Sequence, residues 1–239
     1  MRLSIITAVA FAFGSGAALA QGAHPQISPD GERVAYFSLD MSTRSASIHV
    51  YSFASGEVET VDTGRLWSVN PAWHPHENRI AFGGAVRGMS DVWNVYEMDL
   101  DTGEVTQLTD TPHREAHTSY SPDGRWLAFV RMGPTADVFT MDLASREAVA
   151  LTSSEAREFH VKWADDNTLV YDLSEGTDSW IVSQGLEGEP GRIEQADSEG
   201  RVGLPSVQAG TGALAFAVRR PAGSELVVLS GEARSVVYS

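Results

Sequence analysis

Two four-residue segments of the chain carry side chains that could bind a polar ligand or a metal ion. They are Arg114-Glu115-Ala116-His117 and Arg157-Glu158-Phe159-His160, which repeat an Arg-Glu-x-His pattern after 43 residues. A guanidinium can hold a carboxylate through two parallel hydrogen bonds, and a glutamate can orient a neighbouring arginine or histidine. The repeated pattern indicates a polar binding site if the fold brings the two segments together.

Both segments belong to a longer internal repeat. The turn sequence SPDG occurs at 28–31 and 121–124, and degenerate turns start at residues 74, 164 and 209. After each turn comes an apolar triplet that ends in an aromatic residue. These aromatic residues are 42 to 47 positions apart in the sequence: Tyr36, Phe82, Phe129, Tyr171 and Phe216. Five matches at a nearly constant period indicate five structural repeats.

Each repeat predicts four short strands. In the third repeat, residues 118–121 lead into the Pro-Asp-Gly turn, and strands follow at 126–131, 138–143 and 148–152. A period of about 40–45 residues with four strands is typical of a β-propeller blade. We therefore expect one all-β domain over residues 21–239, a propeller of four-stranded antiparallel blades. Five blades are predicted at about 24–64, 70–110, 117–153, 160–195 and 204–239. A six-bladed ring with one incomplete blade is the alternative.

Equivalent positions of a rotational repeat form rings around the propeller axis. Four residues before each of the first four turns stand His24, Asn70, His117 and His160, while the fifth repeat offers Leu204-Pro205. We expect these polar side chains to line one mouth of the central channel as a binding site, together with Arg114, Glu115, Arg157 and Glu158. Neutral imidazoles there could bind a divalent ion such as Zn²⁺ or Mn²⁺. Two other interpretations stay open, namely hydrogen bonds between blades and contacts with a protein or a small polar ligand.

The repeats also show a family pattern. It reads PAWHPHENRIAF followed by VYEMDLDTGEVTQLT within Pro71 to Thr109, and TSYSPDGRWLAF followed by VFTMDLASREAVALT within Thr118 to Thr152. This pattern resembles the WD40-like (PD40) repeats of the TolB family, which implies a propeller that binds a protein of the cell envelope. That family has an N-terminal α/β domain before a six-bladed propeller. Here we expect no such domain, because the first repeat begins at about residue 24.

Composition limits the classes of partner. The formal net charge of −15 over 239 residues disfavours nucleic acid. Arg2, the apolar run 3–13 and Ala18-Leu19-Ala20 predict a signal peptide over residues 1–20 that is cleaved near Ala20, and hence a periplasmic or secreted protein. With no cysteine, lipid attachment, disulfides and thiol chemistry are excluded. No other segment is long and apolar enough to predict stable membrane insertion.

These observations favour a non-enzymatic protein- or ligand-binding module of the cell envelope. We expect it to act as a monomer, without a cofactor, on an envelope protein or a small polar ligand. The chain lacks the Gly-x-Ser-x-Gly motif of serine hydrolases, and its matched inner positions carry histidine and asparagine instead of glycosidase carboxylates. The repeats are also similar in class to oligogalacturonate lyases, which implies an alternative: a metal-dependent polysaccharide lyase, or a sugar-binding propeller, that uses the histidine-rich mouth and a divalent metal.

Overall fold

The computed structural model describes residues 21–238 except 41, 44, 65, 88–90, 196–199, 209–210, 222 and 232. The predicted signal peptide, residues 1–20, lies outside the described residues. Every regular element in the described part of the chain is a β-strand. Within the same part, no helix has the length and apolar character that crossing a membrane requires.

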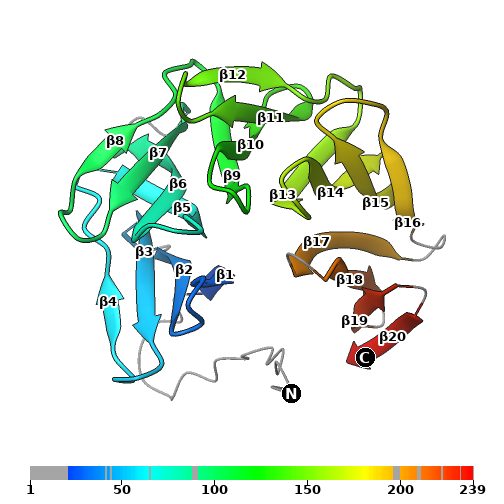
Figure 1. Cartoon of the computed structure of the whole chain (residues 1–239), viewed down its shortest axis with the longest axis horizontal. Coiled ribbons are helices and arrows are strands. Elements are labelled where there is room, and N and C mark those ends of the chain that lie inside the picture. Colours follow the sequence, from blue (N-terminus) through cyan, green and yellow to red (C-terminus); the bar gives the residue numbers. More distant parts are fainter. Residues whose placement is uncertain are drawn as a thin grey trace.

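The described strands form five blades of four antiparallel strands, each blade in sequence order (Figure 1). Blade 1 comprises β1 (Gln21–Ile27), β2 (Arg33–Asp40), β3 (Ser45–Ser52) and β4 (Val58–Thr60). Blade 2 comprises β5 (Leu66–Trp73), β6 (Arg79–Val86), β7 (Asn94–Asp99) and β8 (Val105–Gln107). Blade 3 comprises β9 (Arg114–Tyr120), β10 (Trp126–Met132), β11 (Ala136–Asp142) and β12 (Glu147–Ala150). Blade 4 comprises β13 (Arg157–Trp163), β14 (Thr168–Glu175), β15 (Asp178–Gly185) and β16 (Gly191–Gln195). Blade 5 comprises β17 (Arg201–Gln208), β18 (Ala213–Arg220), β19 (Gly223–Ser230) and β20 (Ala233–Tyr238).

The two SPDG sequences form the same tight turn between the first two strands of their blades. Gly31 and Gly124 have φ of 77° and 74°, a conformation that glycine adopts without steric cost. In the second turn, the Ser121 hydroxyl accepts a hydrogen bond from the Trp126 N–H at 2.9 Å. These turns carry no chemistry of their own, but they fix where each inner strand ends.

Consecutive blades pack face to face through the repeated apolar triplets. Side chains of a strand alternate between its two faces. Phe129 therefore packs with Ala81 of the preceding blade, and Ala128 packs with Tyr171 of the following blade. All four side chains are 0% exposed. The aromatic residue of one blade and the alanine of its neighbour thus make the core between them, and the predicted all-β propeller of four-stranded antiparallel blades is confirmed.

The inner strands lie around the centre of the molecule (Figure 1), and the cavities that their residues line form a central channel. In the described part of the chain, β1, β5, β9, β13 and β17 contact one another in this order, but β17 and β1 do not pack together in the same way. Figure 1 shows the opening between blade 5 and blade 1. Each inner strand begins three or four residues before the predicted blade boundary. In β9 and β13, the first residue forms a parallel bridge with the preceding blade.

Candidate functional site

Every inner strand is interrupted by a β-bulge at the same place. The pairing with the second strand of the blade shifts register there, for example between Phe159 and Lys162 in β13. Each shift leaves two residues of the inner strand unpaired, and the first of the two has a positive φ of 51° to 58°. These first residues are His24, Asn70, His117, His160 and Leu204. Non-glycine residues rarely adopt this conformation, which costs of order 1–3 kcal/mol and is often found at functional sites. Because the apolar Leu204 has the same conformation, the bulge is a feature of every blade of the fold. The chemistry of the mouth therefore depends on which residue type occupies the bulge.

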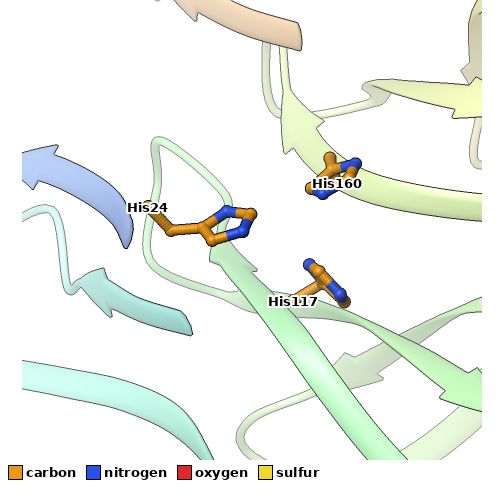
Figure 2. Close-up of side chains that lie close together, drawn as sticks. All are labelled: His24, His117 and His160. Carbon is orange, nitrogen blue, oxygen red and sulfur yellow. The ribbon is translucent and has the colours of Figure 1, made fainter. Parts of the chain in front are cut away.

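The bulges place three histidines around one end of the channel. The His24 ring stacks on the His160 ring with centroids 5.2 Å apart, and the His117 ring meets His160 edge-on at 4.8 Å. Figure 2 shows the three rings converging. One nitrogen from each ring can be chosen so that all three lie within 4.8 Å of one another. Asn70 and Leu204 line the same cavity, whose volume is about 360 Å³.

The local environment keeps at least two of these imidazoles neutral near pH 7. Burial, followed by the electrostatic effect of the neighbouring His160, Lys162 and Arg219 side chains, lowers the pKa of His24 to about 4. Burial also lowers the pKa of His117 well below its usual value, and His160, His24 and Lys162 act in the same direction. A neutral imidazole offers a nitrogen lone pair, so both side chains can accept a hydrogen bond or bind a metal ion.

His160 is oriented by a carboxylate that sequence reasoning did not identify. Its Nδ1–H donates to Oδ1 of Asp172 at 2.7 Å, and the Asp172 residue is 6% exposed. Because a carboxylate only accepts, this bond places a proton on Nδ1, and Nε2 is the nitrogen whose lone pair the neutral ring would offer. Metal-binding histidines are commonly held in this way by a carboxylate behind the ring.

Lys162 is the second residue that sequence reasoning missed. It follows His160 by two positions and lines the channel from the same strand, β13. Burial lowers the pKa of its ammonium group to about 8. Both missed residues occupy unusual positions within their repeats. Asp172 follows the apolar triplet where the other blades have Phe37, Gly83, Val130 and Ala217, and Lys162 stands where they have Gln26, Ala72, Ser119 and Ser206.

The structure corrects the expectation that the two Arg-Glu pairs line the channel mouth. Glu115 and Glu158 are 0% and 1% exposed and point into the interior of the molecule. Glu115 accepts hydrogen bonds from the Arg131 Nε–H at 2.8 Å and from the Thr109 hydroxyl. Glu158 accepts a hydrogen bond from the Ser154 hydroxyl at 2.6 Å. Both glutamates therefore connect segments of the blades.

Arg114 and Arg157 are exposed, and neither lines the cavity of the mouth. Arg114 forms a parallel bridge with Trp93 of blade 2, and Arg157 forms the corresponding bridge with Ala136 of blade 3. The Arg157 guanidinium lies over the Phe159 ring at 5.4 Å. The start of each of these inner strands is thus attached to the preceding blade. Of the eight predicted site residues, the structure brings His24, Asn70, His117 and His160 together.

Known proteins share both the sequence pattern and the architecture. The chain is 31% identical over 114 residues to YuxL, an uncharacterised peptidase of Bacillus subtilis. The matched region covers 46% of this chain and 17% of that protein. It is 32% identical over 104 residues to the uncharacterised protein Atu1656 of Agrobacterium fabrum, which covers 43% of this chain and 33% of that protein. The chain therefore spans only a third or less of these relatives by matched length.

Two solved structures show the same fold at low sequence identity. TolB from Acinetobacter baumannii superposes with a TM-score of 0.75 at 19% identity, over 92% of this chain and 55% of that one. An oligogalacturonate lyase in complex with manganese superposes with a TM-score of 0.61 at 12% identity, over 88% of this chain and 63% of that one. The sequence model of the TolB beta propeller domain (PD40) matches residues 20–236. Because this match covers almost the whole chain, the protein belongs to the TolB beta propeller domain family.

Proposed function

We propose that the protein is a non-enzymatic binding module of the cell envelope that holds its partner at the histidine-lined mouth of the channel. The observation that carries this proposal is the bulge that turns His24, Asn70, His117 and His160 toward one cavity. A concave site with convergent polar groups is what binding a polar group requires. The signal-peptide pattern of residues 1–20 supports export to the periplasm, and membership of the TolB propeller family supports a protein of the envelope as partner.

A crosslinked pull-down from periplasmic extract tests this proposal. The variant His24→Gly/Asn70→Gly removes two polar side chains, and glycine keeps the positive φ of the bulge without strain. We expect wild-type protein to retain one envelope protein that this variant loses. His113→Gly is the matched control, because His113 is an exposed histidine outside the cavity. If the double variant retains the envelope protein as well as wild type does, the partner binds at a surface other than the mouth.

A metal-dependent lyase is the second candidate function, and the three-histidine cluster favours it. His24, His117 and His160 could supply three nitrogen ligands, with Asp172 supporting His160 from behind. Neutral imidazoles suit Zn²⁺ and Mn²⁺, and the solved oligogalacturonate lyase was obtained with manganese. A divalent ion would supply Lewis-acid polarisation of a bound carboxylate or carbonyl group. The imidazoles and the Asp172 carboxylate would fix the ion against the channel wall.

Elemental analysis of protein produced with added zinc and manganese tests the second candidate. If the cluster holds an ion, wild-type protein and the exposed-histidine control His113→Gly carry one equivalent, and His117→Gly carries none. Asp172→Asn is expected to weaken the affinity for that ion by about 10- to 100-fold, because the carboxylate behind His160 is lost. Metal-free wild-type protein would remove the lyase from consideration and leave the binding module.

A further inference from the structure

The channel differs in charge from the rest of the molecule. The chain has 32 aspartate and glutamate residues against 17 lysine and arginine residues. Two described cavities follow the channel, the mouth cavity of about 360 Å³ and a second one of about 400 Å³ near the Ser121-Pro122 turn. Among the described residues, no aspartate or glutamate lines either cavity, whereas Lys162 lines both. In a protein this acidic, such a channel attracts negative charge.

Lys162 lies in the channel, and no described carboxylate forms an ion pair with it. It forms no ion pair or side-chain hydrogen bond within the described residues, although it is half-buried. Two buried carboxylates of blades 3 and 4 already have partners, Glu115 with Arg131 and Asp172 with His160. Removing an ammonium group from water is costly unless an opposite charge or hydrogen-bond acceptors replace the water. An anionic ligand would supply both.

Arg219 gives the mouth a second positive charge from the neighbouring blade. It lies on β18 of blade 5, lines the same cavity as Lys162, and forms no ion pair within the described part of the chain. The positive charges of Lys162 and Arg219 both act on His24. A guanidinium and an ammonium group facing one cavity can hold an oxyanion between them. The neutral imidazoles can add hydrogen bonds to its other polar groups.

We propose that the channel mouth binds a small organic anion through a carboxylate held between Lys162 and Arg219. This inference rests on the proposed function, because it names the chemistry of the group that the mouth takes. Two cations that line one cavity suit a ligand with one or two negative charges. The same two cations oppose a bare divalent ion at the histidines, so direct anion binding and metal binding make different predictions.

Isothermal titration of chelator-treated protein at low salt tests this proposal with glucuronate, glucose and inorganic phosphate. Glucuronate is expected to bind, and glucose, which lacks the carboxylate, is not. Lys162→Met keeps most of the apolar stem and should weaken glucuronate binding at least tenfold, with a smaller loss in Arg219→Gln. Arg125→Gln is the matched control, since it removes an equal charge from an exposed turn outside both cavities. We expect this control to bind as wild type does.

Each of the other outcomes has a defined meaning. If phosphate binds more tightly than glucuronate and its binding also depends on Lys162, the mouth is an anion site whose preferred ligand is phosphate. The proposal is overturned if glucose binds as well as glucuronate, if Lys162→Met binds as wild type does, if neither anion binds, or if binding needs added Mn²⁺. Failure here leaves the pull-down result intact, because a protein partner can contact the mouth through neutral groups. Far-ultraviolet circular dichroism of each variant separates lost binding from lost folding.

Discussion

Replacing Phe129 by alanine is expected to lower the free energy of unfolding by about 3–5 kcal/mol. Phe129 is 0% exposed and lies between blades 2 and 3, where its ring stacks on that of Phe139 at a centroid distance of 5.7 Å. Its truncation removes apolar contacts and leaves a cavity that the two surrounding sheets cannot fill without moving together. Urea unfolding followed by circular dichroism measures this loss. An unchanged dependence of the unfolding free energy on urea concentration would show that the variant exposes the same surface on unfolding as wild type does.

Tyr36 is the internal control for this prediction, because it occupies the same position of the repeat in blade 1. Its neighbours Ala35 and Phe37 pack against blade 2, so Tyr36 lies on the opposite face of β2. This face borders the opening toward blade 5, and Tyr36 is only half-buried. Tyr36→Ala should therefore cost clearly less than Phe129→Ala. Equal losses of unfolding free energy in the two variants would mean that the outer face of blade 1 is packed as completely as the faces between consecutive blades.

The positions of the three histidines could be predicted because they depend only on the repeat. His24, His117 and His160 each stand four residues before a turn. A propeller brings equivalent residues of different blades to the same height along its axis. Equal spacing from a recognisable turn is therefore sufficient to place them together. The three positions can be predicted without predicting the bulge, because the bulge occurs in all five inner strands and shifts equivalent residues equally.

The Arg-Glu pairs could not be placed in this way, because their orientation depends on interactions outside their own repeat. Glu115 accepts a hydrogen bond from the hydroxyl of Thr109 in the preceding repeat, and Arg114 is bridged to Trp93 of the preceding blade. The bulge also changes the alternation of side chains between position 115 and His117. Two side chains that are close in sequence therefore need not point toward the same side of the strand. Asp172 and Lys162 were missed for a different reason: each is a charged residue at a position that is uncharged in the other blades.

Acid is expected to destabilise the protein through the histidine cluster. The pKa of His24 is about 4 in the folded protein and about 6.5 when the chain is unfolded. Between these values the unfolded state binds a proton that the native state does not bind. The stability from His24 is therefore fully present above pH 6.5 and is lost as the pH falls through 4. The loss at pH 4 is about 3 kcal/mol for this residue alone, and His117 adds to it in the same direction.

Urea unfolding at pH 7 and at pH 4 measures this loss, and His24→Asn isolates the contribution of one residue. Asparagine tolerates a positive φ and does not titrate, so the variant keeps the bulge and removes the proton site. Its loss of stability between the two pH values should be smaller than that of wild type by about 3 kcal/mol. The exposed-histidine variant His113→Asn should behave as wild type. An undiminished loss in His24→Asn would mean that a charged imidazole is tolerated at the mouth beside Lys162 and Arg219, and the acid sensitivity would then have to come from carboxylates.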